Sequence, residues 1–197
     1  PYTTLFRSRL NNPLTTSFSF LGKEFPINLA FDHVLDVFEI IQDESLILED
    51  KIELSILILV GEVDLDILQK FEMFKYVYDE YLLLGQHSEV ETDELGNELP
   101  TKINSKDIDL VYDAKYIYAS FRQIGINLFE EQGKMSWEEF QALLESLPDN
   151  CIMQRIIQIR NWEPQKGESS KEKRRMRELK RKYALPNTDL GEEEEDG

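Results

Sequence analysis

The clearest fold signal in the chain is the stretch Met135-Ser136-Trp137-Glu138-Glu139-Phe140-Gln141-Ala142-Leu143-Leu144. Ser136 and Glu139 have the spacing of a capping box, in which a hydroxyl and a carboxylate satisfy the first free amides of a helix. The apolar residues that follow recur at helical spacing, and Pro148 is placed to end the helix. The segment therefore predicts an amphipathic helix with these residues facing a core: Trp137, Phe140, Leu144 and Leu147.

Helical periodicity continues toward the N-terminus. Asn28 is a candidate N-cap for a helix whose apolar positions are Phe31, Val34, Leu35 and Phe38. A second helix is predicted over 49–60; it is apolar on nearly all sides, so we expect it to be central, and Gly61 would end it. A third is predicted over 64–84, where we expect the aromatic side chains to line the core or a groove: Phe71, Phe74, Tyr76, Tyr78 and Tyr81.

Three further helices are predicted toward the C-terminus. One carries apolar residues from Leu110 to Ile124 and ends at Gly125. The next would be capped by Asp149 or Asn150 and has an apolar stripe over 152–159. The last runs from about Ser169 to Tyr183, with basic side chains around a narrow apolar side formed by Met176, Leu179 and Tyr183.

Near the start of the chain, the pattern changes to alternation. Residues 17–21 alternate, Gly22-Lys23 can form a turn, and residues 24–27 continue extended, with Pro26 confining the second strand to an edge or to its end. The fold class predicted is mainly α: a compact helical domain of about six or seven helices with a short N-terminal β-hairpin.

We expect one helical domain over 13–186, made of two helical halves joined by an acidic loop at 85–106. Residues 1–12 are predicted to be a non-native or disordered start, because Pro1–Ser8 looks like translated adapter sequence. Residues 187–197 are predicted to be a disordered acidic tail, because a run of like charges repels itself.

The charge balance limits the classes of partner. The chain has 22 Lys+Arg and 39 Asp+Glu, a net charge of −17, which disfavours general binding to nucleic acid. Basic residues nevertheless gather over 166–182, where one helix could contact an acidic protein surface. The contact candidates are Arg174, Arg175, Arg177, Lys180 and Arg181. The longest apolar run, 56–60, is far too short to cross a bilayer, so we expect no membrane interaction.

Few residues could carry chemistry. Cys151 is the one cysteine, and a small buried thiol is favoured over a nucleophile because no histidine is near it in sequence. His33 and His87 lack partners at metal-ligand spacing, and an exposed or capping role is expected for His33. An EF-hand loop starting at Glu89 fails because Glu94 stands where a glycine is needed. We therefore predict no catalytic, metal or cofactor site and no enzyme activity.

Several blocks together resemble the bacteriophage "gene product fifteen" family of tailed phages and prophages of Gram-positive bacteria. The resemblance runs from about Leu14 to Pro186 and rests on the 22–28, 51–54, 117–121, 125–128, 135–144, 147–150, 156–160 and 182–186 segments. It points to these side chains as core or partner contacts: Tyr118, Phe121, Trp137, Phe140, Leu144, Ile156, Arg160 and Tyr183.

The resemblance also implies a role. Such proteins are encoded in the tail module near the tape-measure gene, which implies a tail assembly chaperone in the host cytoplasm. Its expected partners are the tape-measure protein or tail-tube proteins, with self-association open. Two alternatives remain at this stage: a structural virion or tail completion protein, and a nucleic-acid-binding regulator that uses the basic helix over Lys171–Lys182, which the net charge disfavours.

Overall fold

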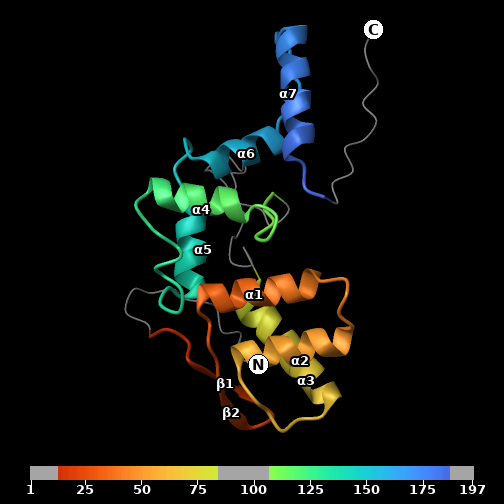
Figure 1. Ribbon diagram of the computed structural model, residues 1–197, viewed down its shortest axis with the longest axis vertical. Coiled ribbons are helices and arrows are strands. Elements are labelled where there is room, and N and C mark those ends of the chain that lie inside the picture. Colours follow the sequence, from red (N-terminus) through yellow and green to blue (C-terminus); the bar gives the residue numbers. More distant parts are fainter. Residues whose placement is uncertain (1–12, 84–106, 187–197) are drawn as a thin grey trace, which may run out of the picture. The chain divides into compact units, whose positions relative to one another are not determined.

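The computed structural model describes residues 13–83 and 107–186 (Figure 1). The predictions made for residues 1–12, for the acidic loop from 85 to 106 with its His87 and EF-hand test, and for residues 187–197 lie outside these ranges. The described elements confirm the predicted fold class: the protein is mainly α, with one antiparallel hairpin.

The chain divides into two compact units. Among the described residues, the first unit contains 13–83 and 129–145, and the second contains 107–128 and 146–186. Helix α5 (Trp137–Glu145) therefore belongs with the N-terminal elements, although α4 (Ala114–Gln123), which precedes it in the sequence, belongs to the second unit. Each unit is described separately below.

The first unit begins with a hairpin of β1 (Ser17–Phe20) and β2 (Lys23–Pro26), in which Phe20 pairs with Lys23. Pro26 ends the second strand, as predicted. The turn is Leu21-Gly22 rather than Gly22-Lys23, and both of its residues have positive φ, 49° and 74°. Such a two-residue turn matches the twist of the strands, and this accounts for the shift by one residue.

Helix α1 (Phe31–Gln42) starts differently from the prediction. Asn28 is not its N-cap: the cap is Ala30, and the Asn28 Oδ1 accepts a hydrogen bond from the Ala30 N–H at 3.1 Å. The backbone before α1 instead pairs with the backbone before α5. The Phe31 N–H donates to the Met135 carbonyl at 3.1 Å, and the Trp137 N–H donates to the Leu29 carbonyl at 2.7 Å. This bridge fixes where α5 begins.

Helix α2 (Leu48–Leu59) is not central, contrary to the prediction. One side is buried through Ile52, Ser55, Ile56 and Leu59, whereas Leu54 and Leu57 are exposed. Gly61, with φ of 93°, follows its end as predicted. The apolar residues on nearly all sides of α2 therefore indicate a helix with an exposed apolar surface and not a helix that is fully buried.

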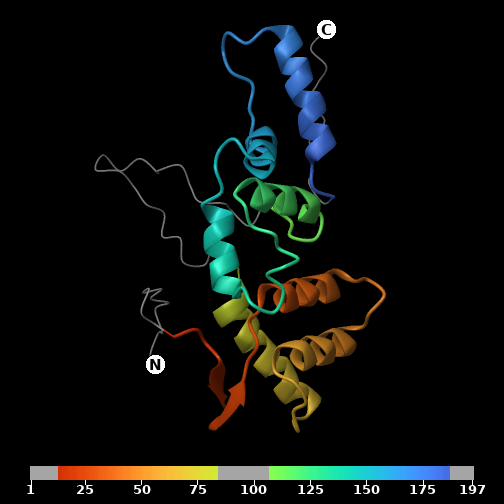
Figure 2. The same ribbon diagram turned by 60° about the vertical axis from the view of Figure 1, so that its left-hand side comes forward.

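Helix α3 (Ile67–Val77) continues as a π-helical turn, η1 (Tyr78–Leu82). It starts three residues later than predicted, because Asp66 forms a reciprocal capping box with Gln69. Its buried side consists of Met73, Val77 and Leu82, while the aromatic residues expected to line the core are exposed or half-buried. α2 and α3 pack side by side (Figures 1 and 2).

Trp137 is at the centre of the first unit's core. It is fully buried, stacks on Phe140 with ring centroids 5.4 Å apart, and Phe140 stacks on Phe31 at 5.2 Å. The indole Nε1–H donates to the Leu82 carbonyl at 3.2 Å, so its polar atom is satisfied. Trp137, Phe140 and Leu144 are all buried, which confirms the predicted inward side of α5. Leu147 is also buried, but it lies beyond the end of the helix, which was predicted to include it. The Ser136 Oγ accepts from the Glu139 N–H at 3.2 Å, which is one of the two hydrogen bonds of the predicted capping box.

The second unit contains α4, α6 (Ile152–Arg160) and α7 (Ser170–Tyr183). The N-cap of α6 is Cys151, whose Sγ accepts from the Gln154 N–H at 3.4 Å, so neither Asp149 nor Asn150 caps this helix. Cys151 is buried, as predicted. Gly125, with φ of 90°, follows α4 as expected.

Helix α7 starts at a capping box between Ser169 and Glu172. Its predicted apolar residues Met176, Leu179 and Tyr183 are half-buried. Of all the helices in the described ranges, none is long and apolar enough to cross a membrane.

Candidate functional site

Most aromatic and aliphatic candidates from the sequence lie inside their own unit. Trp137, Phe140 and Leu144 are in the interior of the first unit, and Phe121 and Ile156 are in that of the second. Tyr118 is half-buried, and its hydroxyl donates to the Asn127 Oδ1 at 3.4 Å. The five buried side chains pack the cores and present no surface to a partner.

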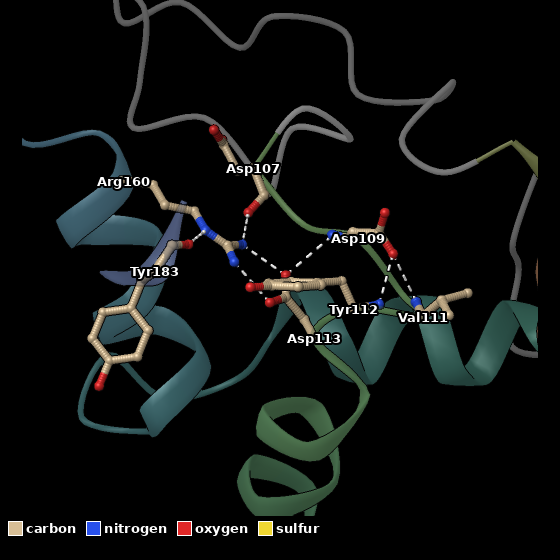
Figure 3. Close-up of polar contacts among 7 residues, drawn as sticks. All are labelled: Asp107, Asp109, Val111, Tyr112, Asp113, Arg160 and Tyr183. Carbon is tan, nitrogen blue, oxygen red and sulfur yellow. Dashed lines mark hydrogen bonds and ion pairs between the residues drawn. The ribbon is translucent and has the colours of Figure 1, made fainter. Parts of the chain in front are cut away.

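Arg160 and Tyr183, predicted separately, lie together in the second unit (Figure 3). The Arg160 Nε–H donates to the Tyr183 carbonyl at 2.7 Å, which ties the end of α6 to the end of α7. The Arg160 Nη1 donates to the Asp107 carbonyl and to the Asp113 Oδ2, and Nη2 donates to the Asp113 Oδ1, each at 2.7 Å.

The Arg160–Asp113 pair is a buried, two-pronged ion pair. The side chain of Arg160 is 8% exposed and that of Asp113 is 0% exposed, so each charge depends on the other for solvation. Asp113 also accepts from the Asp109 N–H at 3.1 Å, and Asp109 accepts from the Val111 and Tyr112 amides. These bonds shape the turn that leads into α4. Arg160 thus joins the end of α6 to the end of α7 and to the segment that precedes α4.

Sequence reasoning found Arg160 but missed Asp113. The sequence does indicate that Arg160 has an acidic partner, because an arginine at the end of an apolar stripe needs a hydrogen-bond acceptor when it is buried. With 39 acidic residues in the chain, periodicity could not choose the partner.

The outward side of α7 is basic. Arg174, Arg175 and Arg181 are exposed, as are Lys171 and Lys182. Arg177 and Lys180 are half-buried, and the Lys180 Nζ donates to the Trp162 carbonyl at 3.0 Å. The candidates on this helix thus divide into an exposed set and a set that packs against the second unit.

The first unit carries an apolar surface that sequence reasoning missed. We call it the α2–α3 face and define it by Leu54, Leu57, Ile67, Leu68 and Phe71. Leu57, Leu68 and Phe71 are 53%, 75% and 43% exposed. Isolated exposed leucines are ordinary, but five large apolar side chains on two packed helices form a candidate contact surface.

Charge is divided between the two units. The described residues of the first unit include 20 acidic and 5 basic residues, a net charge of −15. Those of the second unit include 8 acidic and 13 basic residues, a net charge of +5. The strongly acidic character of the chain is therefore a property of the first unit, which also carries the α2–α3 face.

The shifted pKa values have local structural causes. Hydrogen bonds from the Ser169 hydroxyl and backbone lower the pKa of Glu172, and those from Ser45 lower the pKa of Asp43. Burial raises the pKa of Tyr81, and a hydrogen bond with Tyr76 raises it further. Within 13–83 and 107–186, no group of three or more His, Cys, Asp or Glu side chains could hold a metal ion. The described residues thus offer contact surfaces as candidate functional sites.

Comparison with known proteins gives one family. No curated protein and no solved structure matches the chain. Residues 10–185 match the family described as "Bacteriophage Gp15 protein", which confirms the resemblance seen in the sequence. Because this match spans most of the 197 residues, the chain belongs to the bacteriophage Gp15 protein family.

Proposed function

We propose that this phage protein is a noncatalytic tail assembly factor that acts as a chaperone for the tape-measure protein in the cytoplasm of the bacterial host. The observation that carries the proposal is the α2–α3 face, an exposed apolar surface on a unit whose described residues have a net charge of −15. A chaperone of this kind needs apolar surface to cover its client. It also needs charge of one sign to keep the complex soluble.

Family membership supports the same proposal. The chain is a bacteriophage Gp15 protein, and the resemblance on which it was identified implies a place in the tail module. Tail-tube proteins and further copies of this chain are additional partners to test. The basic outward side of α7 would suit an acidic surface on one of them.

Co-expression tests the proposal. The tape-measure protein of the same phage is produced with and without this chain, and its soluble fraction is measured. We expect the soluble fraction to rise several-fold and the two proteins to co-purify. An unchanged soluble fraction would contradict the proposal.

Purified virions distinguish a chaperone from a structural component. Quantitative mass spectrometry should find the tape-measure protein but not this chain in finished particles. Stoichiometric amounts in the particle would instead assign the protein to the virion or to tail completion.

A further inference from the structure

The α2–α3 face has the layout of a docking surface for a helix. On α2, Leu54 and Leu57 are three positions apart, and on α3 Phe71 follows Ile67 by four positions, so each pair lies along one side of its helix. Apolar side chains that are exposed on two packed helices can receive the apolar ridge of a third helix.

An ion pair joins the two helices beside these residues. The Lys70 Nζ lies 2.7 Å from the Glu53 Oε1. Leu57 is about one turn from Glu53, and Ile67 is about one turn from Lys70. Leu57 and Ile67 both lie toward the connection between α2 and α3. Their helical spacing places each of them on the side of its helix that carries the ion pair.

The charges around this face are mainly negative. Between positions 47 and 77 there are seven acidic residues and three lysines. Two of the lysines are already engaged: Lys51 donates to the Ile41 carbonyl, and Lys70 pairs with Glu53. An incoming helix would therefore meet exposed carboxylates beside the apolar ridge, among them Glu62, Asp64 and Glu72.

We propose that the α2–α3 face binds an amphipathic helix of another protein, one whose apolar stripe is flanked by Lys or Arg. This inference rests on the proposed function, because the natural source of such a helix would be the tape-measure protein. A second copy fits poorly. Its first unit is equally acidic, and the apolar side of its α7 is half-buried in its own unit.

A synthetic peptide tests the partner chemistry on the full-length protein. The probe is a fluorescent amphipathic helix of about 20 residues with a leucine stripe flanked by lysines, read by fluorescence anisotropy. A second peptide keeps the leucines and replaces every lysine with glutamate. We expect the lysine peptide to bind at least about tenfold more tightly at physiological salt, where charges act over about 8 Å.

Substitutions test the location. The double variant Leu57→Ser/Phe71→Ser should weaken binding of the lysine peptide by about tenfold or more, since each side chain loses buried apolar area in the complex. Leu14→Ser is the matched control, because Leu14 is as exposed as Leu57 (57% and 53%) but lies outside the face. It should bind as the parent chain does.

Neutral variants separate local charge from total charge. Glu62→Gln/Asp64→Asn/Glu72→Gln removes three carboxylates beside the face and should weaken the lysine peptide about fivefold. Asp36→Asn/Glu39→Gln/Glu44→Gln changes the net charge equally, elsewhere in the first unit, and should have a smaller effect.

The inference is overturned if the parent chain binds neither peptide, if it binds both equally, or if the double variant binds as well as Leu14→Ser. Concentration-dependent self-association that the double variant abolishes would assign the face to a second copy instead. Failure of the proposed function is separable from these results. If the double variant still keeps the tape-measure protein soluble, the face is wrong and the function stands; if peptide binding holds but the parent chain leaves the tape-measure protein insoluble, the function is wrong.

Discussion

At the scale of single residues, two fully buried serines differ in what their hydroxyls do. The Ser120 Oγ donates to the Tyr116 carbonyl at 2.8 Å and accepts from the Met153 N–H at 3.1 Å, which links α4 to the start of α6. The Ser55 Oγ in α2 has no hydrogen-bond partner among the described residues. Burial is the same for both, so they form a natural matched pair.

We expect Ser120→Ala to lower the free energy of unfolding by about 2 kcal/mol, because it leaves the buried Met153 N–H without a hydrogen-bond acceptor. Ser55→Ala should change it by less than about 0.5 kcal/mol, since no bond is lost. Urea denaturation followed by circular dichroism measures both values. Equal losses in the two variants would show that the link between α4 and α6 contributes nothing beyond side-chain volume.

At the scale of elements, the start of α7 has a titratable cap. The Ser169 hydroxyl donates to the Glu172 carboxylate at 2.8 Å, and the Ser169 N–H donates to it at 3.1 Å. These bonds lower the pKa of Glu172 below its model-compound value of 4.5. Because the folded-state pKa is the lower one, the stabilising contribution is present above the ordinary pKa and is lost as the pH falls through the folded-state value.

We therefore expect the first turn of α7 to fray on acidification below about pH 4.5. In an NMR titration of the Glu172 carboxyl carbon, Ser169→Ala should raise the pKa toward its ordinary value. Ser170→Ala, one residue further and inside the helix, serves as the control and should leave the pKa of Glu172 unchanged. A pKa that is insensitive to Ser169 would remove the physical basis of this cap.

The elements also show how far the sequence could predict the structure. Helix α5 was predicted correctly because cap, periodicity and terminating proline agree locally. Helix α2 was wrongly predicted to be central, because an apolar pattern cannot distinguish burial in a core from exposure on a contact surface. The N-cap of α1 was missed because the start of this helix is set by backbone pairing with the segment before α5. The N-cap of α6 was missed because a cysteine thiol, which is an uncommon cap, occupies the position.

At the scale of the whole molecule, each unit contains one of the two tryptophans. Trp137 is the buried centre of the first unit, and Trp162 is half-buried in the second. Its Nε1–H donates to the Glu168 Oε1 at 3.4 Å, and its carbonyl accepts from Lys180. Fluorine NMR of protein labelled with 5-fluorotryptophan thus reports on both units without any substitution.

We expect Arg160→Lys to lower the stability of the second unit by about 2 kcal/mol, because an ammonium cannot reproduce the two-pronged contact with Asp113. In a urea titration, the Trp162 resonance should then unfold at a lower concentration, while that of Trp137 keeps its midpoint. Phe31→Leu, in the first unit's core, should do the reverse. Coincident shifts in both resonances would mean that the two units unfold as one cooperative body.

The position of Trp137 has a consequence for biosynthesis. The ribosome makes the hairpin and α1 to α3 first, but the indole around which their core closes is not made until residue 137, after α4 of the other unit. The first unit therefore cannot complete its core until α5 has been made. More than fifty further residues are made between the end of α3 and the start of α5. During this time the apolar side chains of the first unit's core remain exposed, and such a state is prone to aggregation.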